Sequence, residues 1–226
     1  MLVAQRAGRW LAAVVAWTLV VIVLLRWVPP PTSAFMVGRW AGGVVGREPP
    51  VRITYEWVPW DVIAPAARLA VVAAEDQRFP THRGFDIGAI RRAMNEARAN
   101  PRGASTITQQ TARNLFLWSG RSWLRKGLEA YLAALLELCW SKRRILEVYL
   151  NVVEFGDGVY GIEAASRRFF GKPAARLGST EAALLAAVLP NPKRWRADRP
   201  SPGVLVRAHR VQRQMAQLGT AYLATL

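Results

Sequence analysis

Cysteine and histidine are scarce in this chain of 226 residues, which contains one Cys and two His. A single Cys excludes an internal disulfide, and so few Cys and His residues disfavour a zinc site of the usual Cys/His type. Cys139 falls in an apolar stretch with helical spacing, which is typical of a small core residue rather than a nucleophile. Any chemistry in this protein is therefore expected to depend on other side chains.

Acidic residues are also few, since 15 Asp and Glu stand against 31 Lys and Arg, giving a net charge of +16 at pH 7. Such a chain attracts polyanions, which include nucleic acid, anionic lipid headgroups and phosphorylated substrates. Alternating apolar and polar residues do not continue far enough to indicate a sheet, and no internal repeat is found. The pattern predicts a mainly α-helical protein.

One long uncharged stretch runs from Trp10 to Leu25. Arg26 separates it from Trp27, Val28 and three consecutive prolines. Trp residues near both ends are typical of membrane interfaces, and the arginine side chain can reach the headgroup level. We therefore expect a transmembrane anchor over residues 10–28, a cytoplasmic segment over residues 1–9, and an external domain. A cleaved signal peptide is the alternative, although no convincing cleavage motif is present.

The rest of the chain is expected to form a linker followed by one helical domain. Residues 29–60 are rich in Pro, Gly and Trp and read as a linker and edge segment with a short β-like piece, and residues 61–226 form the domain. Apolar periodicity predicts its helices, and Gly219 is expected to end the last of them. The expected N-caps are Asp86, Ser105 or Thr106, Ser122 and Ser141. The expected helices cover residues 66–74, 87–100, about 106–117, 123–140, 142–151, 162–170, 180–189 and 204–218.

A polar stretch from Ala73 to Asp86 follows the first helix of this domain and carries Glu75, Asp76 and His82. A helix C-terminus carries partial negative charge, which opposes ionisation of an acid placed there. A carboxyl group at such a position suits proton transfer near neutral pH. The alternative is an ordinary polar turn whose two Phe side chains fill the core.

A second candidate stretch covers residues 103–114, where Gly-Ala-Ser-Thr opens a helix. Backbone N–H groups at a helix N-terminus can bind an anion, and Gln110 and Arg113 share a face one turn further on. The alternative is a capped helix with a polar face, because this sequence is a weak phosphate signal.

Two further stretches lie downstream. Arg125 and Lys126 stand one turn before Glu129, which indicates either an exposed ion pair or a carboxylate held by cations beside a phosphate site. Residues 142–161 combine an amphipathic helix with a Gly-rich loop, and by themselves they are best interpreted as scaffold.

Together, these four stretches resemble the peptidoglycan glycosyltransferase family. The motifs are Glu-Asp-x-x-Phe-x-x-His-x-Gly-x-Asp, Gly-x-Ser-Thr-Ile-Thr-Gln-Gln-x-x-Arg-Asn, Arg-Lys-x-x-Glu and Ile-Leu-Glu-x-Tyr-Leu-Asn, in this order. The similarity covers roughly residues 65–195 and is greatest to the monofunctional branch, which residues 114–123 and 181–192 resemble. The motifs Ser-x-x-Lys and Lys-Thr-Gly, expected in the penicillin-binding domain of bifunctional relatives, do not occur. The resemblance implies a mainly α, lysozyme-like fold and polymerisation of lipid II into glycan strands.

The resemblance also implies roles for individual residues. Glu75 would be the general base on the 4-hydroxyl of the acceptor sugar, and Glu129 would assist the leaving pyrophosphate, directly or through Mg²⁺ or Mn²⁺. Residues implied in substrate binding are Asp76, Phe79, His82, Thr106, Gln110, Arg113, Asn114, Arg125 and Lys126. Residues implied in membrane contact are Leu115, Phe116, Leu117, Trp118 and Trp123. Arg113 departs from the family pattern, in which a Lys is expected.

The implied partners are lipid II, a glycan linked to undecaprenyl pyrophosphate, the bacterial inner membrane and proteins of division or cell-wall synthesis. No organic cofactor and no nucleic acid are expected. Two other functions fit parts of the sequence. A muramidase would also use two carboxylates in a helical domain, and a membrane-anchored binding module would also be basic.

Overall fold

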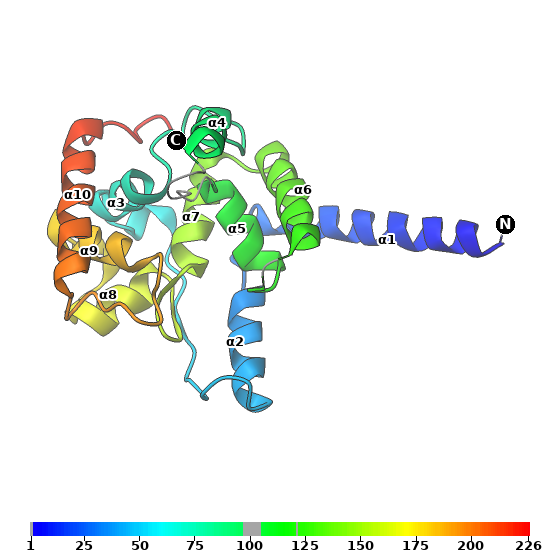
Figure 1. Ribbon diagram of the computed structural model, residues 1–226, viewed down its shortest axis with the longest axis horizontal. Helices are drawn as coiled ribbons and strands as arrows, with labels where there is room; N and C mark the ends of the chain where they lie inside the picture. Colours follow the sequence, from blue (N-terminus) through cyan, green and yellow to red (C-terminus); the bar gives the residue numbers. More distant parts are fainter. Residues whose placement is uncertain (1, 97–104, 121) are drawn as a thin grey trace.

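The computed structural model describes residues 2–96, 105–120 and 122–226, and it is mainly helical, as predicted (Figure 1). Its α-helices are α1 (Leu2–Leu25), α2 (Ala34–Val44), α3 (Pro65–Glu75), α4 (Ile87–Glu96), α5 (Ile107–Phe116), α6 (Trp123–Cys139), α7 (Lys142–Val152), α8 (Ile162–Phe170), α9 (Ser179–Val188) and α10 (Pro202–Leu218). Short 3-10 turns lie at Trp60–Val62 and Ala174–Arg176.

The helix starts follow from N-cap residues. Thr106 accepts a hydrogen bond from the Gln109 amide at the start of α5, and Ser122 and Ser141 do the same for α6 and α7. Asp86 accepts one from Ala89 N at 2.8 Å and so precedes α4 as predicted. The expected continuation of α4 to residue 100 lies outside the described residues.

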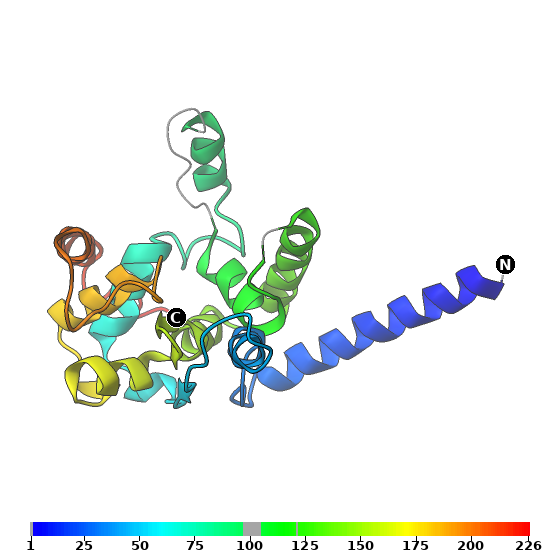
Figure 2. The same cartoon turned by 60° about the horizontal axis from the view of Figure 1, so that its bottom comes forward.

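The core is built around α7, whose apolar face is completely buried. α3 packs against α9 and α10, while α5 packs against α6 and α7 (Figure 2). Every residue of α9 after Glu181 is Ala, Leu or Val, and a helix that is apolar all round is buried by its neighbours. This packing holds the C-terminal end of α3 and the N-terminal end of α5 in the interior of one domain.

A small sheet is also present, and here the expectation that no sheet forms is wrong. β1 (Thr54–Tyr55) pairs in parallel with β3 (Val159–Tyr160), which pairs antiparallel with β2 (Glu154–Gly156). Strands of two or three residues are too short to show an alternating pattern in the sequence. The sheet fastens the segment before the helical domain to the loop between α7 and α8.

The segment expected to be a linker contains a helix, α2. Ser33 caps it by accepting a hydrogen bond from Met36 N at 3.2 Å. Arg39 of α2 is buried, donates to Asp157 at 3.0 Å and pairs with Glu48 at 3.3 Å. The contact with Asp157, 118 positions along the chain, packs the segment onto the domain.

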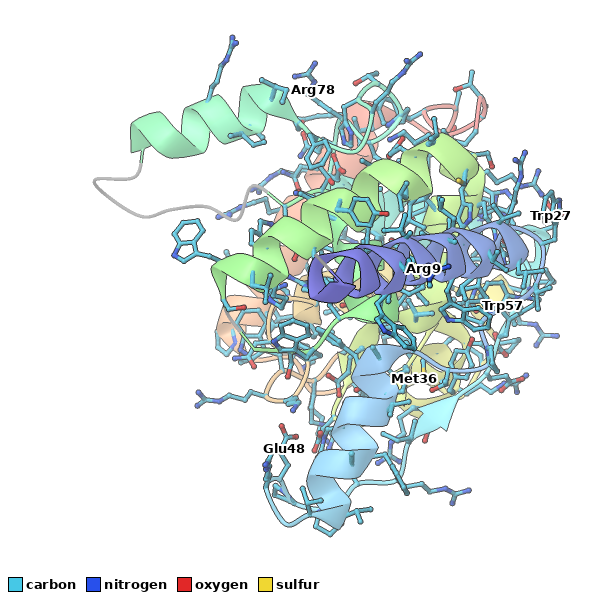
Figure 3. All side chains as sticks on the ribbon, turned by 90° about the vertical axis from the view of Figure 1, so that its right-hand side faces the viewer. Arg9, Trp27, Met36, Glu48, Trp57 and Arg78 are labelled. Carbon is cyan, nitrogen blue, oxygen red and sulfur yellow. The ribbon has the colours of Figure 1, made fainter. Side chains whose placement is uncertain are left out.

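The helix α1 projects from the domain and is fastened to it only near its C-terminal end (Figures 1 and 2). Trp140 Nε1 donates to Ile22 O at 2.7 Å, and Arg144 donates to Leu25 O and Val28 O at 2.8 Å. Figure 3 looks along this helix, with Arg9 on the projecting part. None of the helices in the described residues is both long and apolar enough to cross a membrane, so the anchor expected over residues 10–28 is not confirmed.

Gly161 is a position where the backbone requires glycine. Its φ is +87° and its ψ 154°, and a Cβ there would lie 2.6 Å from Asn151 O. We expect Gly161→Ala to lower the free energy of unfolding by about 3 kcal/mol, because backbone strain and a clash add together. Urea denaturation measures this change.

Gly171→Ala is the matched control for that substitution. Gly171 also has a positive φ, +67°, but a Cβ there meets nothing within 4 Å. A loss of about 1 kcal/mol is expected from the left-handed conformation alone. Equal losses at the two positions would contradict the proposed clash with Asn151.

Candidate active site

Glu75 is the last residue of α3, and its two carboxylate oxygens have different surroundings. Oε2 accepts a hydrogen bond from Gln110 Nε2 at 3.0 Å. Oε1 is buried and has no hydrogen-bond partner among the described residues, and Arg207 Nη2 of α10 lies 3.5 Å from it. Gln110 therefore holds one oxygen in place, while the other accepts no hydrogen bond within the described part of the chain and faces the Arg207 guanidinium.

Tyr149 of α7 orients the side chain that holds Glu75. Its hydroxyl donates to Gln110 Oε1 at 2.9 Å, which directs the Gln110 amide nitrogen toward Glu75. Complete burial raises the pKa of Tyr149 well above its usual value, Glu75 and Asp76 raise it further, and Arg113 opposes them. The phenol therefore stays protonated and acts as a donor, a role that the sequence had suggested only as inward-facing scaffold.

Asp76 and His82 fix the loop after α3 rather than facing solvent. Asp76 is buried and accepts hydrogen bonds from His82 Nε2 at 2.9 Å and from Ile107 N at 3.0 Å. Ile107 N is at the N-terminus of α5, where the helix dipole favours a carboxylate. Phe79 has no exposed surface and packs edge-on to His82. These residues shape the loop that follows Glu75, and substrate contact by Asp76 and Phe79 stays a prediction.

Thr106 also serves the scaffold. It is 3% exposed, caps α5 through Gln109 N, and donates its hydroxyl proton to Gly84 O at 2.6 Å. Asn114, on the same helix, is 4% exposed. Both side chains are buried in this structure, and the substrate contacts expected of them stay a prediction.

Glu129 lies on α6 and is held by the two cations that the sequence placed beside it. Its side chain is 1% exposed. Arg125 Nη1 lies 2.7 Å from Oε2, and Lys126 Nζ pairs with Oε1. Lys126 also donates to Ser105 Oγ at 3.2 Å, and its side chain is 43% exposed. This is a buried ion cluster, not an exposed ion pair, and Lys126 brings its charge to the surface.

The two acidic centres lie on either side of α5. Glu75 contacts this helix through Gln110, and the Glu129 cluster contacts its start through Ser105. The views agree that α3 and α6 flank α5 (Figures 1 and 2). The arrangement can accept a proton on one side of α5 and present positive charge to an anion on the other.

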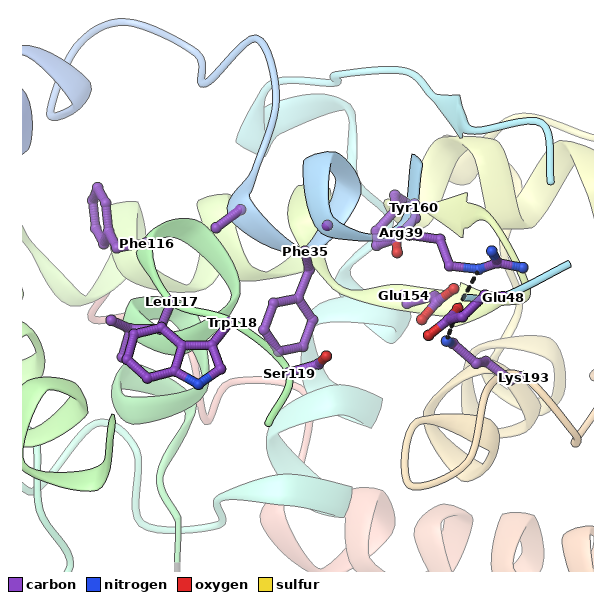
Figure 4. Close-up of a pocket in the computed structure, with 12 residues that line it drawn as sticks. Phe35, Arg39, Glu48, Phe116, Leu117, Trp118, Ser119, Glu154, Tyr160 and Lys193 are labelled. Carbon is purple, nitrogen blue, oxygen red and sulfur yellow. Dashed lines mark hydrogen bonds and ion pairs between the residues drawn. The ribbon is translucent and has the colours of Figure 1, made fainter. Parts of the chain in front are cut away.

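Arg113 lies at the last turn of α5 beside a cavity of about 410 Å³. Its guanidinium stands 6.0 Å from the ring of Phe35, which lines that cavity, and its Nε has no hydrogen-bond partner among the described residues. Figure 4 shows an apolar end with Phe35, Phe116 and Trp118 and a charged end with Glu48 and Lys193. Arg113 thus lies near the C-terminal end of α5, whereas Lys126 contacts Ser105 just before the N-terminal end of that helix.

Burial changes the pKa values of two groups at the charged end of this cavity, Glu154 and Tyr160. Desolvation raises the pKa of the Glu154 carboxyl, although the Gly158 N–H that it binds at 3.0 Å acts in the opposite direction. Burial also raises the pKa of Tyr160. The remaining charges are paired, since Glu48 lies 2.8 Å from Lys193.

A resident divalent metal does not fit the residues at Glu129. Both carboxylate oxygens are occupied by Arg125 and Lys126. No group of three His, Cys, Asp or Glu side chains that could hold a metal occurs in the described part of the chain. No step of the chemistry is therefore assigned to a protein-bound metal.

A family model described as Transglycosylase matches residues 44–216, which contain Glu75, Gln110, Tyr149, Glu129 and Arg207. The chain belongs to this family.

Curated proteins named biosynthetic peptidoglycan transglycosylase are similar to the chain along nearly its entire length. The one from Pseudomonas putida is 53% identical over 225 residues, covering 98% of this chain and 95% of the relative. The one from Stutzerimonas stutzeri is 50% identical over 223 residues, with coverage of 96% and 90%. The one from Mannheimia succiniciproducens is 49% identical over 224 residues, with coverage of 98% and 92%.

The surface expected to contact a membrane is only partly available in this transglycosylase-family chain. Leu115 and Leu117 are 7% and 5% exposed and belong to the core, which corrects their assignment to that surface. Phe116 is half-buried, whereas Trp118 and Trp123 are 48% and 93% exposed. Membrane contact by the two Trp residues stays a prediction.

Proposed function

We propose that this protein is a peptidoglycan glycosyltransferase that polymerises lipid II into glycan strands for cell-wall synthesis. Family membership supports this function, and so do the names of the relatives. The observation that carries the mechanism is the unequal pairing of Glu75, in which Gln110 binds Oε2, whereas Oε1 accepts no hydrogen bond from the described residues and lies 3.5 Å from Arg207 Nη2. The Glu129 cluster on the other side of α5 supplies the positive charge that the reaction also needs.

In the proposed reaction, the 4-hydroxyl of the acceptor sugar gives its proton to Glu75 Oε1. The oxygen of that hydroxyl then attacks the anomeric carbon of the donor with inversion, and the bond from that carbon to the lipid pyrophosphate breaks. A sugar hydroxyl is a weak nucleophile until a base takes its proton. Glu75 suits this role because Gln110 and Tyr149 fix its orientation before the substrate binds.

The leaving pyrophosphate gains negative charge as the bond breaks. Cations fixed in position stabilise such charge without reorganising during the reaction. Lys126 and Arg125 are fixed by the buried Glu129, and we propose that Lys126 meets the pyrophosphate at the surface. A divalent cation, where it takes part, would arrive bound to the pyrophosphate, as Mg²⁺ usually does with phosphate substrates.

We also propose that the enzyme works at the outer face of the bacterial inner membrane, where a lipid-linked substrate is found. Exposed aromatic side chains support an interfacial position, because Trp partitions to the headgroup region. They are Trp10, Trp17 and Trp27 of the α1 region, Trp40 of α2, and Trp118 and Trp123 around the start of α6. Division or cell-wall proteins remain expected partners.

The test of this function is a comparison of substrates. Purified full-length protein with lipid II and Mg²⁺ or Mn²⁺ should produce glycan strands, and finished cell wall should release no sugars. Sugar release from finished cell wall without lipid substrate would instead indicate a muramidase. Binding that weakens steeply with salt, with no product from either substrate, would indicate a basic binding module.

A further inference from the structure

A second polar cavity, of about 350 Å³, adjoins Glu75 on the side away from α5. Ala74 of α3 and one face of α10 line it. The α10 residues are Arg207, Arg210, Val211 and Gln214, whose spacing places them on one face of a helix. α10 packs along both α3 and α9, so the cavity has a rigid wall.

The lining is positive and contains no acidic side chain. Arg207 reaches only one anion, Glu75 Oε1 at 3.5 Å, and its buried Nε has no hydrogen-bond partner among the described residues. Arg210 is exposed and forms no ion pair within the described part of the chain. Two guanidinium groups thus face one cavity with most of their donors unused, which is the arrangement that recognises a carboxylate or a phosphate.

We propose that this cavity binds a carboxylate of the peptide stem carried by the lipid-linked sugar. The inference rests on the proposed function, in which the substrate is a disaccharide-pentapeptide. The cations proposed for the pyrophosphate, Arg125 and Lys126, belong to α6. The helices α6 and α10 lie on opposite sides of the domain, separated by α3 and α5 (Figures 1 and 2). An anion beside α10 is therefore different from the leaving pyrophosphate of the donor. The acceptor offers two kinds of anion, its own pyrophosphate and the stem carboxylates, and the stem is the source that we propose and test below.

This cavity would select substrates by their stem. Arg207 lines the cavity and also pairs with Glu75, so a carboxylate bound there would also hold the sugar near Glu75 Oε1. The contact between the stem carboxylate and the arginines is equally strong in the bound substrate and in the transition state. Such uniform binding changes KM rather than kcat.

The decisive variant is Arg210→Gln, because Arg210 lines the cavity without contacting Glu75. Its matched control is Arg213→Gln, which removes the same charge from an exposed position on the same helix that does not line the cavity. Each protein is assayed with lipid II and with lipid II whose stem carboxylates are amidated. For native lipid II we expect Arg210→Gln to raise KM about tenfold, the effect of one lost charge-assisted contact.

With amidated lipid II, the unmodified protein should show the same raised KM, and Arg210→Gln should raise it no further. Arg210→Lys should recover part of the loss on native lipid II. An unchanged KM in Arg210→Gln, an equal rise on both substrates, or an equal rise in Arg213→Gln would overturn the proposal. A rise on both substrates together with competitive inhibition by inorganic pyrophosphate that Arg210→Gln relieves would assign the cavity to phosphate instead.

An equilibrium titration separates this inference from the proposed function, since it needs no turnover. Lipid-free stem peptide is added to the full-length protein and binding is followed by NMR. Binding that Arg210→Gln weakens about tenfold and Arg213→Gln leaves unchanged supports the stem site even if polymerisation fails. Absence of binding in an active enzyme, with no stem-dependent KM, refutes the stem site alone.

Discussion

Replacing Glu75 with Gln is expected to slow glycan polymerisation about a thousandfold, within the range that a general base contributes. Glutamine keeps the size of the side chain, and its amide oxygen can still accept the hydrogen bond from Gln110 Nε2. What it loses is the basic oxygen, Oε1, which has no hydrogen-bond partner among the described residues. The variant should therefore fold normally and fail in kcat, as measured from initial rates of strand formation from lipid II.

Two further variants make this result specific. Glu75→Asp keeps a carboxylate but withdraws it by about one carbon–carbon bond, and a misplacement near 1 Å costs about a hundredfold. Glu56→Gln applies the same chemical change to an exposed Glu that pairs with Arg167 at 3.4 Å, and it should retain normal activity. A normal rate in Glu75→Gln would end the assignment of Glu75 as the base.

Local sequence determined much of the helical frame. The starts of α5, α6 and α7 could be predicted because Thr106, Ser122 and Ser141 are N-caps, whose effect extends over only three residues. Gly219 was expected to end the last helix, and α10 does end at Leu218. In these cases the residues that decide the boundary lie beside it in the chain.

Features that depend on distant partners could not be read in this way. The start of α2 has a cap at Ser33, but its Gly-rich end and the surrounding prolines suggested a linker. Its buried Arg39 is held by Asp157, which lies 118 positions further along the chain. The first strand of the sheet, β1, is likewise specified by pairing with β3 across more than a hundred residues rather than by its own pattern.

The candidate site shows the same division. Sequence motifs identified the acidic and basic residues of the candidate site. They did not distinguish residues that could face a substrate from residues that hold other residues in position. Asp76 and Thr106 are buried because they join the loop after α3 to the start of α5. Arg207 was missed because it enters from α10, and only the packing of α10 on α3 brings it to Glu75.

The second large effect is expected for Glu129→Gln. Glu129 is 1% exposed and binds both Arg125 and Lys126, so the substitution leaves two neighbouring cations without their shared carboxylate. Removing one partner of a buried ion pair destabilises a protein by about 3–5 kcal/mol. The freed Lys126 should also lose its fixed position, and kcat should fall about a hundredfold because charge on the leaving pyrophosphate is less well stabilised.

Stability and catalysis must be separated in this variant, and α6 offers the control. Glu137 lies two turns after Glu129 on α6, has a side chain that is 11% exposed, and pairs with Lys142 at 2.7 Å. Glu137→Gln should lower the melting temperature by a comparable amount, yet leave kcat nearly unchanged below the transition. If both variants lose kcat in proportion to their loss of stability, Glu129 serves the fold alone. If only Glu129→Gln loses kcat, and it does so well below its melting temperature, the carboxylate acts by holding its two cations toward the departing pyrophosphate.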